Sequence, residues 1–179
     1  MDETTSKPFA MVLGRKTYDI MAAFWPDTPE GEGAKVFNDA TKYVASRSRP
    51  TLEWSNSVLL EGDAAQAIAA LKAEDGPELQ AHGSANLIQT LLQHDLVDGF
   101  RLWQFPVVLD KGKRLFANGS LPAAMRLVNA TTSSTGVVIS TYERAGKLEG
   151  RLDHPRPALA TRTRHGRSST GNRRDKEHR

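Results

Sequence analysis

The 179-residue chain contains no cysteine, which excludes disulfide bonds, thiolate metal sites, iron–sulfur clusters and a cysteine nucleophile. No apolar run approaches the about 18 residues of a membrane-spanning helix. The first residues, 1–7, also lack the apolar core of a secretory signal. We therefore expect a cytoplasmic protein that does not enter a membrane.

Several catalytic motifs are missing as well. The sequence has no H-E-x-x-H, no G-x-S-x-G, no phosphate-binding P-loop and no G-x-G-x-x-G. The five histidines are not spaced as metal ligands with carboxylates, so no metal is expected. These absences disfavour hydrolases, metalloenzymes and the Rossmann type of dinucleotide site.

Positive charge is concentrated at the C-terminus. Residues 144–179 carry 11 Lys and Arg against 4 Asp and Glu, whereas residues 1–143 carry 13 against 17. From residue 146 onwards there is no aromatic residue, no Ile and no Val, so this segment cannot bury enough apolar surface to order itself. We predict a basic, disordered tail over residues 144–179. It is either a solvated tail without a partner or a weak, nonspecific binder of polyanions such as RNA, DNA or acidic lipid.

The remainder of the chain alternates between strand and helix patterns. Apolar runs predict strands at 9–13, 42–46, 57–60, 78–82 and 100–108, and a hairpin formed by 125–132 and 137–142. Helices are predicted after the first strand, ending at Pro26, and after Asp63 and Ser84. This order predicts an α/β domain over residues 9–143, preceded by a short disordered start at 1–8, with a mixed sheet and an antiparallel finish.

The first candidate site is a strand-to-helix turn formed by Gly14, Arg15, Lys16 and Thr17. The free amides and positive dipole end of a helix start, together with two cations, favour an anion such as phosphate. A solvated helix start explains the same residues, so both interpretations stay open.

Two further junctions share this chemistry. Gly83 and Ser84 follow a strand and open a helix, where the glycine admits a ligand close to the backbone and the serine can cap the helix or bind phosphate. Ser46 and Arg47 follow another strand in a loop suited to a phosphate monoester, or in an ordinary polar loop. Three such junctions at strand ends fit the phosphates of a dinucleotide.

These motifs, taken in order, resemble the dihydrofolate-reductase-like superfamily, and within it the reductase domain of the bifunctional riboflavin-biosynthesis deaminase-reductase. The resemblance covers about residues 9–143 and is carried by the segments Leu13–Tyr18, Tyr43–Arg47, Leu79–Ser84, Arg101–Leu109 and Lys113–Phe116. It implies a three-layer α/β fold, with a mixed, mostly parallel sheet, helices on both faces and a C-terminal antiparallel hairpin.

The resemblance also implies an NADPH-dependent reductase acting on a small pteridine- or pyrimidine-like molecule, similar to 5-amino-6-(5-phosphoribosylamino)uracil reductase or to dihydrofolate reductase. It assigns the turn at Gly14–Thr17 and the turn at Gly83 and Ser84 to the cofactor phosphates, and Ser46 and Arg47 to the adenosine 2′-phosphate. Members of the family often form homodimers.

The chain departs from the family at its start, where only Met1–Pro8 precede the first strand pattern. The first strand of the family, which lines the nicotinamide and substrate sites, is expected to be missing. The alternative function is therefore a truncated, inactive remnant that binds a nucleotide or a partner. The sequence does not identify a catalytic residue.

Overall fold

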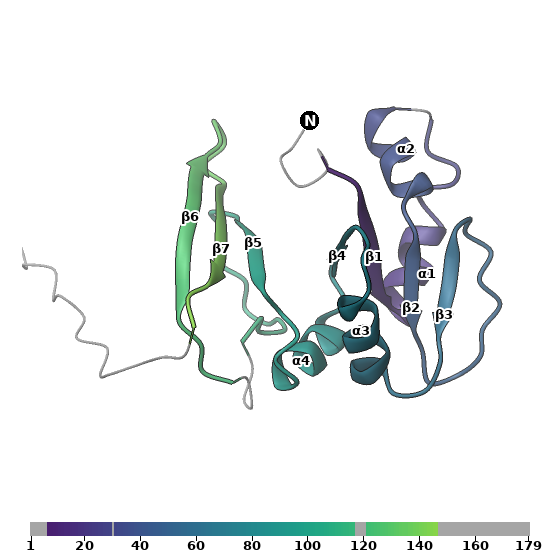
Figure 1. The fold of residues 1–179 in the computed structure, drawn as a ribbon. Coiled ribbons are helices and arrows are strands. Elements are labelled where there is room, and N and C mark those ends of the chain that lie inside the picture. The colour runs from purple at the N-terminus through teal and green to yellow at the C-terminus, as the bar shows by residue number, and fades with distance from the viewer. Residues whose placement is uncertain (1–6, 30, 117–120, 147–179) are drawn as a thin grey trace, which may run out of the picture. The chain divides into compact units, whose positions relative to one another are not determined.

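The computed structural model describes residues 7–29, 31–116 and 121–146 (Figure 1). The chain divides into the units Met1–Leu148 and Glu149–Arg179, and everything described below belongs to the first. The predicted disordered start and basic tail lie almost entirely outside the described residues. The elements, in chain order, are β1 (Phe9–Gly14), α1 (Arg15–Ala22), α2 (Glu32–Asp39), β2 (Lys42–Ala45), β3 (Ser57–Leu60), α3 (Ala64–Ala73), β4 (Glu78–Gln80), α4 (Ala85–Gln93), β5 (Gly99–Gln104), β6 (Met125–Thr132) and β7 (Val138–Arg144).

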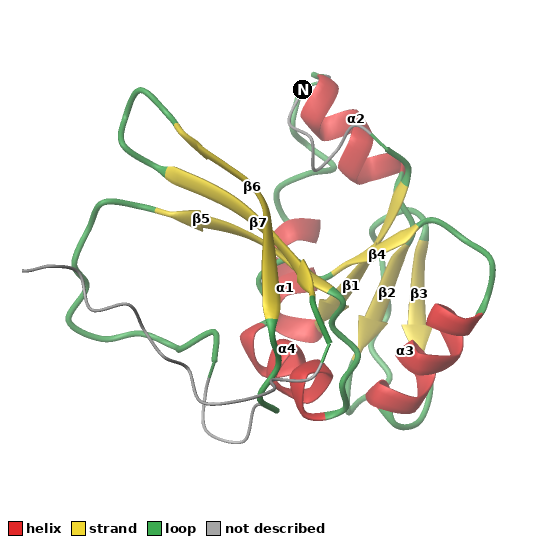
Figure 2. Cartoon of the chain, turned by 60° about the vertical axis from the view of Figure 1, so that its left-hand side comes forward, coloured by secondary structure: helices red, strands yellow, loops and turns green. Residues whose placement is uncertain are grey.

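The strands form two sheets, which Figure 2 shows separately. Four parallel strands are arranged in the order β3-β2-β1-β4, and three antiparallel strands in the order β5-β7-β6. The α/β class, the parallel sheet and the C-terminal antiparallel hairpin are therefore confirmed. One detail differs from the expected single mixed sheet, because β4 and β5 do not pair and each forms an edge.

Strand β1 lies inside the parallel sheet and is buried along nearly its whole length. Because successive side chains of a strand point to opposite faces, β1 contributes to two separate cores. Met11 and Leu13 pack with Tyr18 of α1 and with apolar side chains of α2. Val12 packs on the other face with Ile68 of α3 and with two leucines of α4. The parallel sheet is thus the middle of three layers, with helices on both faces.

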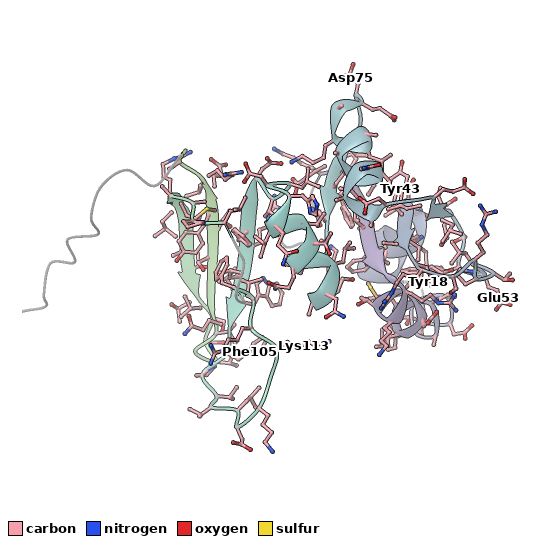
Figure 3. All side chains as sticks on the ribbon, turned by 90° about the horizontal axis from the view of Figure 1, so that it is seen from below. Tyr18, Tyr43, Glu53, Asp75, Phe105 and Lys113 are labelled. Carbon is pink, nitrogen blue, oxygen red and sulfur yellow. The ribbon has the colours of Figure 1, made fainter. Side chains whose placement is uncertain are left out.

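Tyr18 shows how the first of these cores is held. It lies among the elements of the parallel sheet (Figure 3), is buried, and its hydroxyl oxygen accepts a 3.0 Å hydrogen bond from the backbone N–H of Trp54. Nearby, the ring of Trp25 stacks on Phe37 with 4.5 Å between centroids. Both Tyr18 and Trp25 therefore have structural roles.

Side-chain contacts link the second sheet to the first. Arg101 of β5 forms two hydrogen bonds with the carboxylate of Glu78 on β4, at 2.5 and 3.1 Å. Lys72 of α3 pairs with Asp98, which directly precedes β5, at 2.5 Å. The contacts at this junction come from charged side chains, while the backbone edges of β4 and β5 stay unpaired with each other.

Several elements differ from prediction, including β4, which ends at Gln80 and not at His82. Helix α2 was not predicted, and α1 ends at Ala22, four residues before Pro26. Strand β5 ends at Gln104 instead of continuing to Val108. Its partner β7 begins at Val138, which pairs with Gln104, so the residues after Gln104 have no strand to pair with, and Pro106 has no backbone N–H to donate. Within the part of the chain described, no helix has the length and apolar character required to cross a membrane.

Candidate cofactor-binding site

The first predicted turn joins the end of β1 to the start of α1. Gly14 is the N-cap residue of α1 in extended conformation, and no side chain caps the helix. The backbone N–H groups in the first turn of a helix have no acceptor within that helix. The first turn also has no acidic residue that would neutralise the positive end of the helix dipole. This turn therefore presents hydrogen-bond donors and a positive potential.

The second predicted turn joins β4 to α4. Gly83 and Ser84 both have left-handed backbone conformations, with φ of 63° and 45°. Since β1 and β4 are adjacent and parallel, their C-terminal ends meet at the same end of the sheet. The two turns consequently lie side by side.

Two hydrogen bonds join these turns. The backbone N–H of Gly14 donates to Ser84 Oγ at 2.9 Å, and the backbone N–H of Ser84 donates to Thr17 Oγ1 at 3.0 Å. A Cβ placed on Gly83 would lie 3.3 Å from the Thr17 methyl carbon, so the glycine is packed closely against α1. Ser84 does not cap its own helix, contrary to the simpler prediction for this residue.

The two cations of the first turn differ in their surroundings. Arg15 donates from Nε to the Asp19 carboxylate at 2.6 Å, one helical turn further along α1. Its terminal guanidinium nitrogens have no partner among the described residues. Lys16 is exposed. Both charges can reach a ligand at the helix start, although Asp19 partly neutralises Arg15.

The third predicted group lines a separate cavity of about 380 Å³ at the C-terminal ends of β2 and β3. Ser46 and Arg47 form part of one wall together with Ser48 and Arg49. Arg47 is exposed, and neither a hydrogen bond nor an ion pair connects it to any other described residue. A guanidinium that lines a cavity and has no counter-charge is suited to an anionic group of a ligand.

The opposite wall of this cavity was not predicted. It consists of residues 59–62, and within it Glu61 pairs with Arg49 at 3.2 Å. The sequence did indicate that a strand, predicted at 57–60, ends at these residues, and parallel strands end at the same edge of a sheet. That this strand pairs with the strand at 42–46 could not be known from the sequence.

The structure thus brings the predicted residues together in two groups. Gly14, Thr17, Gly83 and Ser84 form one hydrogen-bonded pair of turns, which we call the turn pair. Ser46 and Arg47 belong to the cavity beside β2, which is the neighbour of β1 in the sheet. A larger cavity, of about 480 Å³, is lined mainly by apolar side chains from α4, β5, β6 and the loops between these elements, and contains none of the predicted site residues.

A chain of polar side chains along β4 also escaped the sequence analysis. His82 Nε2 lies 3.1 Å from Gln80 Oε1, and Gln80 Nε2 donates to Glu78 at 3.3 Å. Glu78 in turn accepts from Arg101, whose hydrogen bond lowers the pKa of this carboxyl group. Burial and the positive charge of Arg101 lower the pKa of His82, which directly precedes Gly83. The sequence indicated this chain of side chains only through their spacing, because positions 78, 80 and 82 of the predicted strand would lie on one face.

No set of three His, Cys, Asp or Glu side chains placed to hold a metal ion occurs in the described ranges 7–29, 31–116 and 121–146. The site therefore consists of backbone amides, two hydroxyl groups and cationic side chains. This combination binds anionic groups with several acceptor oxygens.

Solved structures show the class of fold. A protein from Shewanella sp. PV-4 that is named for riboflavin biosynthesis aligns with a TM-score of 0.62 and 24% identity, over 78% of this chain and 75% of its own. A pyrimidine reductase-like protein from Corynebacterium diphtheriae aligns with a TM-score of 0.52 and 13% identity, over 75% of both chains. The chain therefore shares its α/β fold with these two proteins.

The family follows from the sequence match. The RibD C-terminal domain family matches residues 1–139, and the chain belongs to this family. Two proteins of Bacillus subtilis (strain 168), both described as uncharacterized, are similar. YyaP is 32% identical over 136 residues, covering 74% of this chain and 72% of its own, and YwjB is 28% identical over 117 residues, covering 65% and 63%.

Proposed function

We propose that this chain binds NADPH and reduces a small pyrimidine- or pteridine-like substrate. The observation that carries the proposal is Arg47, a guanidinium with no partner in the described structure, which lines a cavity at the C-terminal end of β2, the neighbour of β1. An arginine in this state favours a ligand that carries a phosphate at that point, and NADPH differs from NADH by one phosphate there.

The residues present fit such a cofactor. Gly14–Thr17 together with Gly83 and Ser84 would hold the pyrophosphate, because their amides and hydroxyls are donors and phosphate oxygens are acceptors. Ser46 and Arg47 would hold the 2′-phosphate. When bound, NADPH supplies a hydride, and the protein positions it and provides the electrostatic environment.

The substrate class is inferred from the family. The Corynebacterium diphtheriae protein is described as pyrimidine reductase-like, and the Shewanella protein is named for riboflavin biosynthesis. The most specific form of the proposal is a reductase similar to 5-amino-6-(5-phosphoribosylamino)uracil reductase.

A second candidate function is nucleotide binding without reduction. Two carboxylates near the proposed cofactor site, Asp19 and Glu61, are each paired with an arginine, so neither presents an unpaired side chain to a substrate. This candidate requires the same turn pair and the same cavity, so it differs from the first only in turnover.

Binding is tested by titrating the purified chain with NADPH and with NADH while following nicotinamide fluorescence. We expect a clear preference for NADPH. Replacing Arg47 by Ala removes a charged hydrogen-bond donor, so it should weaken NADPH binding by about 10-fold or more and leave NADH binding nearly unchanged. Arg126→Ala is the matched control, because Arg126 is an exposed arginine of β6 paired with Glu143. Equal binding of the two cofactors, or equal effects of the two substitutions, would exclude the proposed 2′-phosphate site.

Turnover separates the two candidates. The chain is incubated with NADPH and either dihydrofolate or 5-amino-6-(5-phosphoribosylamino)uracil, and NADPH absorbance is followed in the near ultraviolet. Consumption that depends on one substrate supports the reductase. Binding of NADPH with no consumption for either substrate supports the nucleotide-binding candidate.

A further inference from the structure

The larger cavity, of about 480 Å³, has no role in the proposed function. Its wall includes Leu92 in the last turn of α4, whereas Ser84 of the turn pair precedes the first turn of that helix. These two positions are separated by about 12 Å along the helix axis, at about 1.5 Å of rise per residue. We propose that this cavity is a second ligand-binding site, and that its ligand is a neutral, planar aromatic molecule with an amide group, either a carboxamide or a ring lactam.

The size and the apolar lining of the cavity fit a small aromatic ring system. Ligand sites in proteins commonly have volumes of about 300–1,000 Å³ and mostly apolar walls with a few polar groups. In this wall, Phe100 and Phe116 contact each other edge to face, with 5.3 Å between ring centroids. Phe116 and Leu121 remain 55% and 53% exposed although they line a cavity. An aromatic ligand would cover these side chains, and the burial of apolar surface favours binding.

An ion pair supplies the polar part of the wall. Asp95 and Arg144 both line the cavity, and the Arg144 guanidinium donates to the Asp95 carboxylate across 49 positions of the sequence. This contact uses one nitrogen of Arg144 and one oxygen of Asp95. The other guanidinium nitrogens and the other carboxylate oxygen have no partner among residues 7–29, 31–116 and 121–146. The pair therefore offers both hydrogen-bond donors and an acceptor to a single ligand.

The local structure at Asp95 does not by itself explain an aspartate at this position. Helix α4 ends in a Schellman motif, in which the N–H of Leu96 donates to the carbonyl of Leu91 at 2.9 Å and Asp95 has a φ of 61°. Glycine is the commonest residue at that position, and a negative charge at a helix C-terminus opposes the helix dipole. Asp95 thus departs from two local preferences, and its carboxylate is instead placed against Arg144 in the wall of the cavity. Such departures are typical of functional sites.

The ion pair also determines which polar group suits the cavity. Because the charges of Asp95 and Arg144 oppose each other, a carboxylate on the ligand would be attracted by one and repelled by the other. The same holds, with the signs reversed, for an ammonium or amidinium group. An amide has no net charge, and it carries a carbonyl acceptor for Arg144 and an N–H donor for Asp95. It can therefore bind both partners without separating them.

The test compares three probes of nearly the same shape. Naphthalene-2-carboxamide is neutral at neutral pH, naphthalene-2-carboxylate is anionic and naphthalene-2-carboxamidine is cationic. Their dissociation constants for the full chain are measured by isothermal titration calorimetry. We expect the wild-type chain to bind the carboxamide about 5-fold or more tightly than either charged probe.

Asp95→Asn should reverse this preference. Asparagine tolerates the left-handed backbone, so the variant should fold. It leaves Arg144 without a counter-charge in the wall, and we expect the carboxylate probe to bind about 10-fold more tightly than the carboxamide. Asp98→Asn is the matched control, because Asp98 lies in the same loop but pairs with Lys72 and does not line the cavity. This control should keep the preference of the wild-type chain.

A second pair of variants tests the apolar wall. Leu121→Ser should weaken binding of the carboxamide by about 3-fold or more, because less apolar surface is buried by the ligand. Leu127→Ser replaces a leucine of nearly equal exposure, 52%, that does not line the cavity, and it should leave binding unchanged. Circular dichroism and thermal unfolding establish the folded state of every variant.

Several results would overturn the proposal. They are a folded wild-type chain that binds none of the three probes, one that binds the carboxylate as tightly as the carboxamide, and an Asp95→Asn variant with the preference of wild type. NADPH should not displace the carboxamide, and displacement would also overturn the proposal by placing the probe in the proposed cofactor site. Because the probes are titrated without NADPH, their failure to bind would leave the proposed function standing, and failure of NADPH to bind would leave this second site standing.

Discussion

His82 is a residue whose surroundings predict a measurable dependence of stability on pH. Its ring packs against the rings of Phe9 and Phe37, which also contact each other, and burial together with the positive charge of Arg101 lowers its pKa below 6.5. In the unfolded chain the pKa returns to about 6.5, so the unfolded state binds more protons in the window just below that value. The free energy of unfolding should therefore rise with pH through this window and fall on acidification.

Urea unfolding at a series of pH values tests this expectation, and an NMR titration of the His82 ring gives its pKa directly. In His82→Gln the free energy of unfolding should depend less on pH in the same window, because the imidazole that titrates there is absent. The other charged groups near His82 are Arg101 and Glu78, and the lowered pKa of Glu78 places its effect at more acidic pH. An NMR pKa at or above 6.5 would contradict the prediction.

Lys42 makes the corresponding prediction at alkaline pH. Its ammonium group donates to the backbone carbonyls of Asn38 and Ser55 at 2.6 and 3.1 Å and lies 4.3 Å from the centroid of the Trp54 ring. Burial lowers its pKa from 10.5 to about 8. Between these two values the unfolded state binds more protons, so the free energy of unfolding should increase as pH rises, by about 3 kcal/mol at most.

The measurement is chemical unfolding of wild type and Lys42→Met across that alkaline range. Methionine occupies a similar volume without a titrating group, so the variant should lose the pH-dependent increase while remaining folded. If the free energy of unfolding increased equally with pH in the two proteins, groups other than Lys42 would be responsible for the increase. Lys42 is separate from the proposed cofactor site, and NADPH binding by the folded variant should be unchanged.

At the scale of elements, the close packing of the β4–α4 turn on α1 predicts the effect of a single methyl group. In Gly83→Ala the new Cβ would lie 3.3 Å from the Thr17 methyl carbon, on a backbone with φ of 63°. The left-handed conformation alone costs an alanine about 1–2 kcal/mol. We expect a lower midpoint of thermal unfolding and weaker NADPH binding, because the added methyl displaces the turn from α1.

Gly76→Ala is the matched control for this substitution. Gly76 precedes β4, its φ is not in the left-handed region, and an added Cβ would meet no atom within 4 Å. It should change the midpoint of thermal unfolding little and leave NADPH binding unchanged. If Gly83→Ala behaved like this control, the close approach of the two turns would not matter for stability or binding.

The elements differ in how well the sequence predicts them. Strand β1 and helix α4 carry strong apolar patterns, and both were predicted within one or two residues. Helix α2 was missed because it is short, contains Gly33 and has only two large apolar side chains, Val36 and Phe37. It is held by tertiary packing, in which Phe37 contacts Trp25, Phe9 and His82.

The same limit applies to the candidate site. Glycines and hydroxyls at strand ends indicated anion-binding turns, because this chemistry is local. The bond from Ser84 to Thr17 and the wall that faces Arg47 could not be predicted, since they depend on which strands are neighbours. The order β3-β2-β1-β4 supplies that information, and only the three-dimensional structure contains it.

At the scale of the molecule, one short segment carries several exposed apolar side chains in succession. Residues 105–109 follow β5, whose end is marked by Phe105 in Figure 3. Val107, Val108 and Leu109 are 64%, 100% and 77% exposed. Single exposed apolar residues are common in soluble proteins, but a contiguous set forms a surface that binds other apolar groups.

This surface should bind an amphiphilic dye such as anilinonaphthalene sulfonate, and removing it should reduce both dye fluorescence and self-association at high concentration. We expect Val108→Ser combined with Leu109→Ser to lower the dye signal by about half or more and to leave the midpoint of thermal unfolding nearly unchanged, because exposed side chains contribute little to folding. Ile20→Ser is the control, since Ile20 is 71% exposed on α1, away from this segment. If it lowered the signal equally, dye binding would reflect exposed apolar side chains in general. If neither change had an effect, the segment would be covered in solution by other parts of the chain.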